Sequence, residues 1–242
     1  MSCFAIGAAA ADGEVSFNIL KLSGNHVHWQ QAGGQGLVVT YGLVTSARQF
    51  PGARNCRNMV PLDQLLSASN LSSSRLGDEL AAAFAMWEAA ANIRFRQARD
   101  GEHPNILIGA QADPEGWAFA DVFYETASPE PIKPITQSLI CLNPTKRWKI
   151  GFDGDLTIYD LRYTFAHEIG HAIGLDHPSG AGQIMGYRYE ERFRALQAGD
   201  RMGAVVLYGE RKPDGDQVAT GVVAHDPQPP SATRAIASPQ AR

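Results

Sequence analysis

Apolar side chains recur at helical spacing in three stretches of the chain, and each stretch predicts a helix. In residues 72–91 the apolar side chains recur every three or four positions, at Leu76, Leu80, Phe84, Trp87 and Ala91. Three serines that can cap a helix precede them. The same spacing from Tyr159 to Gly174 predicts a second helix. A third helix is expected at about residues 196–208.

Five shorter stretches have the composition of β-strands. They are rich in β-branched and aromatic residues or alternate polar with apolar positions, and they comprise residues 36–44, 92–97, 105–110, 116–125 and 137–142. A loop is expected from Ser46 to about Leu62. Because strands are interleaved with long helices, the pattern indicates an α/β (α+β) fold with a mixed sheet.

The two ends of the chain lack such periodicity. Residues 1–35 are rich in Gly and Ala and predict an extension over the surface. Their apolar run CFAIGAAAA resembles the remnant of a secretion signal without its basic first region, and a disordered N-terminus is the alternative. Residues 211–242 are rich in Pro, Ala, Gln and Ser, which predicts a disordered tail. Residues 36–210 are therefore expected to form one folded domain.

The composition is that of a globular protein, with 44% hydrophobic and 19% charged residues. The formal net charge of -4 and the lack of a basic stripe argue against binding to nucleic acid. No apolar run reaches the roughly 20 residues that a membrane-spanning helix needs, so no membrane span is expected. The sequence does not specify an oligomeric state, and a monomer is the simplest expectation.

The three cysteines, Cys3, Cys56 and Cys141, form no CxxC pair, which excludes a zinc site built from cysteines. If the protein is exported, Cys56 and Cys141 are the natural disulfide pair, because Cys3 lies in the signal-like segment. The alternative is that both are buried free thiols, and the sequence does not choose between these readings.

Residues 167–177, HEIGHAIGLDH, contain three of the seven histidines. His167 and His171 are one helical turn apart, so their imidazoles project side by side and can bind one cation. Gly174 lacks a Cβ and can adopt the left-handed conformation that ends a helix, which would return His177 toward the same point. Three nitrogen ligands leave the fourth position of a zinc ion open to water, as is typical of catalytic zinc.

Glu168 follows the first histidine and is placed to act as general base toward that water, whose pKa zinc lowers toward about 7. Metal, water and base suffice to hydrolyse an amide bond. The alternative reading is a polar, solvent-facing helix end. The added GxxH weakens this alternative, because HExxHxxGxxH is a far more demanding signature than HExxH alone.

Through this pattern, which runs from His167 to His177, the chain resembles the metzincin clan of zinc endopeptidases. The resemblance implies a zincin fold, in which a mixed twisted sheet and two long helices lie above a smaller C-terminal subdomain. It also implies a methionine-containing turn beneath the metal, for which the segment QIMGY offers Met185.

Within the clan the features are mixed. The segments AAAFAMWEAAANIRF and LQAGDRMGAVVLYG and the short gap from His177 to Met185 resemble matrixins, the family of the matrix metalloproteinases. Pro178 and Tyr187 resemble serralysins, which implies that the Tyr187 hydroxyl binds the metal or supports the tetrahedral intermediate; the hypothesis here is that it stabilises the oxyanion. A tyrosine that packs under the turn is the alternative. The resemblance covers about residues 36–210.

The chain departs from matrixins at the sites of further metals. Phe119 stands where the resemblance places a histidine of a structural zinc, so only the catalytic zinc is expected. Asp153 and Asp155 in GFDGDL offer oxygen ligands for calcium, but such a pair around glycine is more often a turn, and calcium needs six or more oxygens. No PRCGxPD-type segment occurs, so Cys56 is not expected to be a latency thiol.

The resulting hypothesis is a zinc-dependent endopeptidase, secreted or periplasmic, that hydrolyses proteins or peptides. Its substrate would lie extended against an edge strand, either residues 105–110 or the segment after Trp117, with a side-chain pocket near residues 186–190. The competing hypothesis is a catalytically silent zincin fold that serves as a binding module and keeps zinc for stability. Glu168 favours catalysis, because a structural zinc needs no neighbouring general base.

Overall fold

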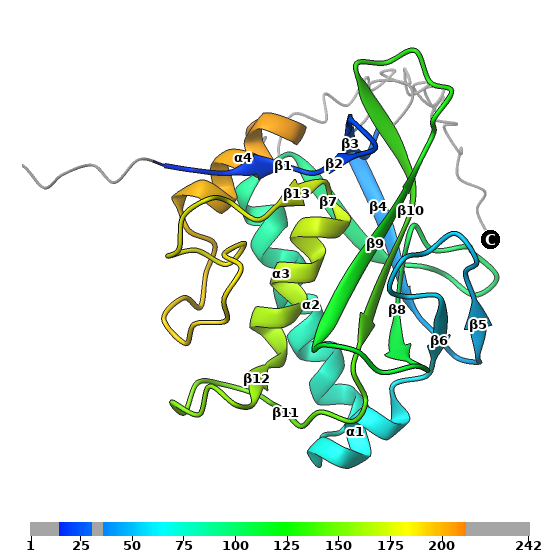
Figure 1. Cartoon of the computed structure of the whole chain (residues 1–242), viewed down its shortest axis with the longest axis vertical. Helices are drawn as coiled ribbons and strands as arrows, with labels where there is room; N and C mark the ends of the chain where they lie inside the picture. Colours follow the sequence, from blue (N-terminus) through cyan, green and yellow to red (C-terminus); the bar gives the residue numbers. More distant parts are fainter. Residues whose placement is uncertain (1–14, 31–35, 212–242) are drawn as a thin grey trace, which may run out of the picture. The chain divides into compact units, whose positions relative to one another are not determined.

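The computed structural model describes residues 15–30 and 36–211. The signal-like run and the C-terminal tail expected from the sequence lie outside these ranges. Within them the chain forms a mixed α/β arrangement, which confirms the predicted fold class (Figure 1). In the same ranges, no helix is both long enough and apolar enough to cross a membrane.

A mixed sheet lies at the centre of the fold. Its main run consists, in spatial order, of β9 (Ala118–Tyr124), β10 (Ile132–Leu142), β8 (Ile106–Gln111), β4 (Leu37–Leu43) and β7 (Ile93–Gln97). Neighbours in this run are parallel except β9, which is antiparallel to β10 and has no second strand partner in the described part of the chain. β9 is therefore an edge strand.

Shorter strands complete the sheet or form separate pairs. Those in the sheet are β2 (Lys21–Leu22), β3 (Asn25–His28), β5 (Arg48–Gln49) and β6 (Asn58–Val60). The separate pairs are β1 (Asn18–Ile19) with β13 (Leu175–Asp176) and β11 (Trp148–Lys149) with β12 (Tyr159–Asp160). The expected loop at 46–62 thus contains the β5–β6 hairpin, and a short helix that the pattern did not predict, α1 (Asp63–Ser69), follows it.

The three predicted helices are present as α2 (Ser73–Ala90), α3 (Leu161–Ala172) and α4 (Ala198–Tyr208). Each begins at a side chain that accepts a hydrogen bond from the first turn, which satisfies one of the free N–H groups at a helix start. These capping side chains belong to Ser72, Asp160 and Gln197.

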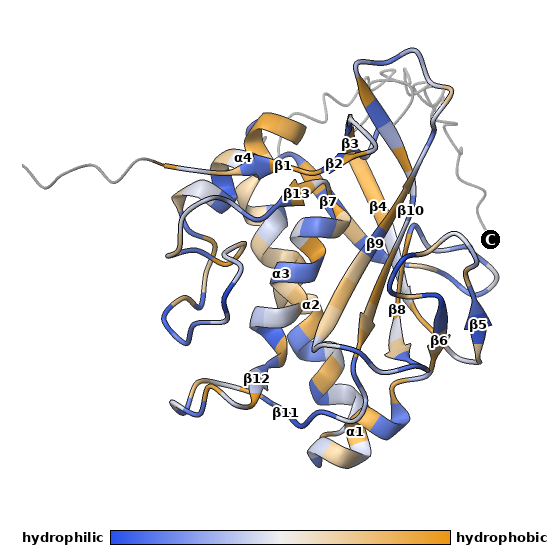
Figure 2. Ribbon diagram, viewed as in Figure 1, coloured by the Kyte–Doolittle hydropathy of each residue, from blue (hydrophilic) through white to orange (hydrophobic). Residues whose placement is uncertain are grey.

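The main hydrophobic core lies between the sheet and helices α2 and α3 (Figures 1 and 2). The buried side of α2 is the predicted one, since Leu76, Leu80, Phe84, Trp87 and Ala91 are all buried. The Trp87 indole N–H donates to the carbonyl of Ala166 at 2.9 Å, which fixes α3 against α2. The helix that carries two of the histidines is thus held from below by the core.

The opposite face of the sheet carries a second, smaller apolar cluster beneath the 46–60 loop. A disulfide between Cys56 and Cys141 lies in it and links the loop to β10. Of the two readings of these cysteines, the structure has the disulfide, so Cys56 has no free thiol to hold a metal. Phe119 packs against the same cluster, and this position therefore serves apolar packing.

Residues 15–30 are built into the fold more closely than the expected surface extension. β3 pairs with β10, and β1 pairs with β13, which directly precedes His177. Val27 and Trp29 are buried in the main core. Strands of two to four residues are too short to show a period, and for this reason the sequence pattern does not predict them.

We expect loss of the disulfide to destabilise the domain. The double variant Cys56→Ala/Cys141→Ala removes a link between positions 85 residues apart, and loss of a native disulfide typically costs about 2–5 kcal/mol. Urea unfolding without reductant should show a lower midpoint for this variant. Cys3→Ala, which retains the pair, is the control, and equal midpoints for the two proteins would contradict the prediction.

Candidate active site

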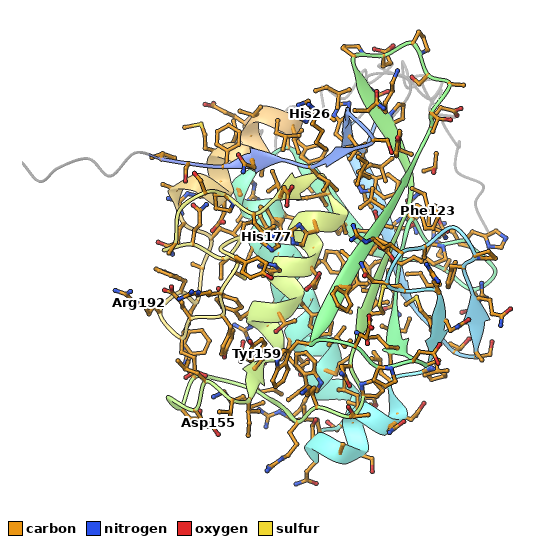
Figure 3. The ribbon with its side chains drawn as sticks, viewed as in Figure 1. His26, Phe123, Asp155, Tyr159, His177 and Arg192 are labelled. Carbon is orange, nitrogen blue, oxygen red and sulfur yellow. A yellow bond between two sulfur atoms is a disulfide. The ribbon has the colours of Figure 1, made fainter. Side chains whose placement is uncertain are left out.

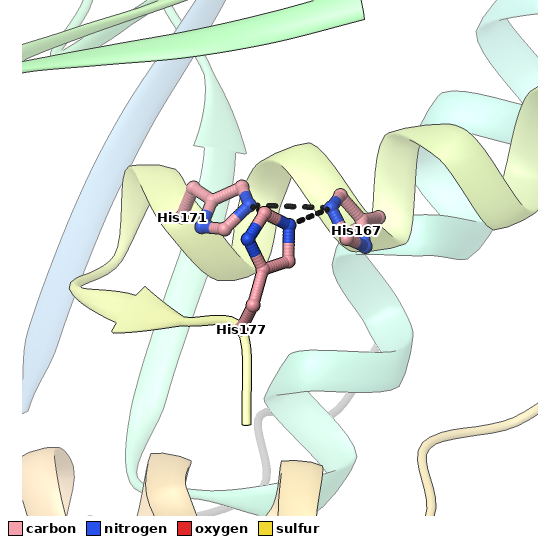
Figure 4. Close-up of side chains that lie close together, drawn as sticks. All are labelled: His167, His171 and His177. Carbon is pink, nitrogen blue, oxygen red and sulfur yellow. Dashed lines mark hydrogen bonds between the residues drawn. The ribbon is translucent and has the colours of Figure 1, made fainter. Parts of the chain in front are cut away.

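His167, His171 and His177 come together at the C-terminal end of α3 (Figure 4). Their Nε2 atoms are 3.1 Å apart between His167 and His177 and 3.2 Å apart in the other two pairs. Nitrogen ligands placed tetrahedrally at about 2.0–2.1 Å from zinc lie about 3.3–3.4 Å from one another. The triangle of nitrogens therefore has nearly the size of one face of a zinc tetrahedron.

Backbone carbonyls determine where the protons of two of these rings lie. Nδ1 of His167 donates to the carbonyl of Ile184 at 2.8 Å, and Nδ1 of His171 donates to that of Leu175 at 2.9 Å. A neutral imidazole carries one proton, so both Nε2 atoms present lone pairs to each other. Two half-buried lone pairs 3.2 Å apart repel, and a cation among them removes the repulsion. This donor set fits a zinc ion.

Burial keeps the three imidazoles neutral. It lowers the pKa of His167 to about 3 and that of His171 to about 4, and the neighbouring histidines add to both shifts. Burial also lowers the pKa of His177. Because a metal binds the neutral ring, these environments favour metal binding at neutral pH.

Gly174 turns the chain between the second and third histidines. Its φ is +101°, in a region that residues with a side chain rarely adopt. Its N–H donates to the carbonyl of His171 at 2.9 Å, and a Cβ on this residue would collide with the carbonyl oxygen of Val27. The chain then runs through β13 and returns His177 to the side of α3.

Glu168 lies beside the histidines in the lining of a cleft. The residue is only 6% exposed. Burial raises the pKa of its carboxyl to about 8, and the negative charge of Asp121 adds to this shift. A cation among the imidazoles acts in the opposite direction and favours the carboxylate form that a general base needs.

Met185 packs directly beneath the histidine helix. A Cβ on Gly170 would overlap its sulfur and would lie 2.9 Å from the ring of Trp87, so only glycine fits there. Asp200 holds the turn from below, because its carboxylate accepts from the N–H groups of Ile184 and Met185, both at 3.0 Å. Sequence patterns give one weak signal for Asp200, its place in the capping box of α4.

The histidines line a cleft of about 680 Å³ that also borders β9. Figure 3 marks three points of its lining with Tyr159, His177 and Phe123. Of the two segments proposed as edge strand, residues 105–110 are the wrong one, because β8 lies between β10 and β4. The segment after Trp117 forms the edge strand β9.

Side chains on β9 alternate between the main core and the second apolar cluster. Ala118, Ala120 and Val122 pack on the side of the main core, whereas Phe119 and Phe123 pack against the second cluster. From residue 118 to residue 122, the side of the strand that faces the main core therefore carries only small or medium-sized side chains, and the cleft lining also includes Phe119, Asp121 and Phe123.

The 46–60 loop forms one rim of the cleft and is tied to β9. Asp121 accepts from the backbone N–H groups of Asn55 at 2.8 Å and Cys56 at 2.7 Å. The disulfide anchors the same turn to β10, and Arg54 lines the cleft beside it. The single acidic residue in the otherwise apolar stretch GWAFADVF is the signal by which the sequence could have indicated Asp121.

Stacked aromatic rings line one part of the cleft. Tyr159 stacks on Trp117 with centroids 3.9 Å apart and on Tyr189 with centroids 4.2 Å apart. Tyr163 meets the Tyr189 ring edge-on at 4.9 Å. Tyr189 lies within residues 186–190, near which the sequence predicts a side-chain pocket, and these rings form an aromatic wall of the cleft.

The ammonium group of Lys149 lies among the oxygens considered as calcium ligands. It donates to the Asp153 carboxylate and to the carbonyl of Asp155, the latter at 2.7 Å, and pairs with Glu191. Glu191 also accepts from the N–H groups of Asp153 at 3.0 Å and Gly154 at 2.6 Å. A side chain of the protein thus supplies the positive charge here, and GFDGDL forms a turn, as expected.

Tyr187 projects into the open cleft and is 82% exposed. Its ring meets that of His177 edge-on, with centroids 5.1 Å apart. The alternative in which this tyrosine packs under the turn does not agree with such exposure. The side chain that carries this hydroxyl group is therefore in contact with the third histidine.

A family model described as matrixin matches residues 64–209, more than half of the chain. The matched range contains helices α2 and α3, strands β9 and β10, the three histidines, Glu168 and Met185. Strands β1 to β6 precede it.

We expect Gly174→Ala to destabilise the domain and to weaken zinc binding. The new Cβ meets both a positive φ and the carbonyl of Val27, so the chain between His171 and His177 has to shift. Backbone strain of this kind costs about 1–3 kcal/mol. Thermal unfolding with and without zinc measures both effects.

The control is Gly77→Ala, at an exposed position of α2 where a Cβ meets nothing within 4 Å. It should leave zinc binding unchanged and raise the unfolding temperature slightly, because alanine is the better helix former. An unfolding temperature and a zinc affinity of Gly174→Ala equal to those of the wild type would exclude the role given to this glycine.

Proposed function

Because the chain belongs to the matrixin family of zinc-dependent endopeptidases, we propose that it hydrolyses peptide bonds of proteins at the histidine centre, with Glu168 as general base. One observation carries the proposal: neutral imidazoles converge through their Nε2 atoms beside a buried carboxylate in an open cleft. Within residues 15–30 and 36–211, this is the one cluster of His, Cys, Asp or Glu side chains arranged to hold a metal.

His167, His171 and His177 would hold the zinc ion through Nε2. When bound, zinc acts as a Lewis acid, lowers the pKa of a water molecule toward about 7 and polarises the scissile carbonyl. The contribution of the chain is to keep the nitrogens unprotonated and oriented. Burial and the carbonyls of Ile184 and Leu175 support this role.

Glu168 accepts a proton from the attacking water and passes it to the leaving amine. Its place on α3, directly after His167 and in the lining of the same cleft, supports this assignment. Burial restricts access of bulk solvent to the carboxylate, so the proton is retained until the amine takes it.

The substrate lies extended along β9. This strand has one strand partner in the described part of the chain, so its other edge is free to bind a peptide backbone by strand addition. Ala118 and Ala120 leave space between the strand and α3. The stack of Trp117, Tyr159 and Tyr189 favours a flat or apolar substrate side chain in the pocket beside it.

Tyr187 stabilises the oxyanion of the tetrahedral intermediate through its hydroxyl. Its exposure in the cleft and the contact of its ring with His177 support this role. The hydroxyl donates a hydrogen bond to the developing charge, which the ground-state carbonyl does not carry.

The competing function, a silent binding module, has less support. A fold that keeps zinc for stability alone needs neither Glu168 nor an open cleft above the histidines. We further propose that residues 36–210 contain the catalytic machinery and that the protein is secreted or periplasmic. The disulfide supports this location, since such bonds persist in oxidising compartments.

We expect Glu168→Gln to lower kcat about 10²- to 10⁴-fold on a peptide library, because the amide cannot accept the proton. Zinc content, measured by mass spectrometry, should stay at the wild-type value. A chelator should abolish wild-type activity and added zinc should restore it. Glu210→Gln, at an exposed position, is the control. Equal, chelator-insensitive rates for all three proteins would reject the peptidase.

We expect Tyr187→Phe to lower kcat about tenfold or more with little change in KM, because the lost hydroxyl acts on charge that develops in the transition state. Steady-state kinetics on the best peptide from the library measure both constants. A variant with the wild-type kcat would leave Tyr187 without a catalytic role.

A further inference from the structure

Residues 15–30 precede the matrixin match but contact the end of α3 and the third histidine. We propose that residues 18–20, which we call the N-terminal clamp, position His177, and that Asn18 is the residue of the clamp that acts on it directly. This inference rests on the metal centre proposed above. It makes a segment at the start of the described chain a part of that centre.

Carbonyl groups at the end of α3 have no partner within the helix and are satisfied by other elements. The carbonyl of Ala172 accepts from Trp29 Nε1 at 3.0 Å and from Ser138 Oγ at 2.9 Å. The carbonyl of Ile173 accepts from the hydroxyl of Tyr208. The end of the helix is therefore held by β10, by α4 and by a residue of the N-terminal segment.

The N-terminal clamp holds the next residues of the same stretch. Leu20 N–H donates to the carbonyl of Gly174 at 2.8 Å, and Ile19 and Asn18 pair with Leu175 and Asp176 in an antiparallel ladder. The amide Nδ2 of Asn18 then donates to the carbonyl of His177 at 2.7 Å, across 159 positions of sequence. The clamp thus contacts every residue from Gly174 to His177.

His177 depends on such support more than the other two histidines do. His167 and His171 are carried by α3, and their Nδ1 atoms donate to backbone carbonyls at 2.8 Å and 2.9 Å. Nδ1 of His177 lies 3.7 Å from the carboxylate of Asp176, beyond hydrogen-bond distance. His177 follows a strand of two residues, so its ring is placed through its backbone.

Hydrogen bonds hold that backbone on both sides of the His177 Cα. The His177 N–H donates to the Asp176 side chain at 2.7 Å, a contact between neighbours that moves with the strand. The Asn18 amide on the His177 carbonyl connects the residue to a different segment of the fold. Of the two hydrogen bonds that hold the His177 backbone, loss of this one leaves only the contact with the neighbouring Asp176.

The test compares Asn18→Ala with Asn25→Ala. Asn18 is exposed, so truncation leaves no cavity, and the side chain of Asn25 donates to the carbonyl of Ser23 within its own hairpin. We expect Asn18→Ala to bind zinc about two- to tenfold more weakly in competition with a chelator of known affinity, as loss of one hydrogen bond implies. Asn25→Ala should match the wild type.

A second readout needs no metal. In the zinc-free protein, hydrogen exchange of residues 174–178 should be faster in Asn18→Ala and unchanged in Asn25→Ala, because the clamp acts on the backbone. Absorption of the Co²⁺-substituted protein should shift only in Asn18→Ala, as the third ligand moves.

The outcomes separate the two proposals. A wild-type protein that binds no zinc would reject the metal centre itself. Zinc binding by the wild type, with equal affinity and equal exchange in both variants, would reject the N-terminal clamp alone. Equal losses in both variants would also reject it, because they would reflect a general loosening of the N-terminal segment.

Discussion

The candidate site depends on a reversal of the chain immediately after a helix. Two histidines on α3 can supply only one edge of a metal triangle, and the third has to return within a few residues of the helix end. Such a reversal exposes carbonyl groups that need partners, and it requires a backbone angle that only glycine adopts easily. The partners come from β10, from α4 and from residues 18–29, which explains why distant segments meet at this point.

The sequence predicts the features that depend on residues close to one another along the chain. The apolar spacing of α2 and α3, the histidines and the glycine after them are all visible within a few turns of sequence. The choice between residues 105–110 and the segment after Trp117 as edge strand was not, because an edge is a property of strand order. Asp121 and Asp200 were also missed, since each acts on backbone N–H groups of a segment distant in the sequence.

A disulfide, hydrogen bonds and an ion pair within the chain hold the segments that surround the cleft. The Cys56–Cys141 disulfide and Asp121 fasten one rim to the sheet, and Lys149 with Glu191 fastens the loop beside the aromatic wall. Phe119 fills the place at which the resemblance to matrixins suggests a metal ligand. Side chains of the protein itself therefore hold both sides of the cleft in place.

The packing of Met185 under Gly170 gives one position inside the zinc motif a meaning that the motif pattern does not contain. HExxH leaves that position open to any residue, but here the methionine sulfur and the Trp87 ring already fill the volume that a side chain would need. Grafting the motif onto the helix of another scaffold would transfer the ligands but not Met185 and Trp87, which pack beneath them. Redesign of such a site has to start from the space below the helix.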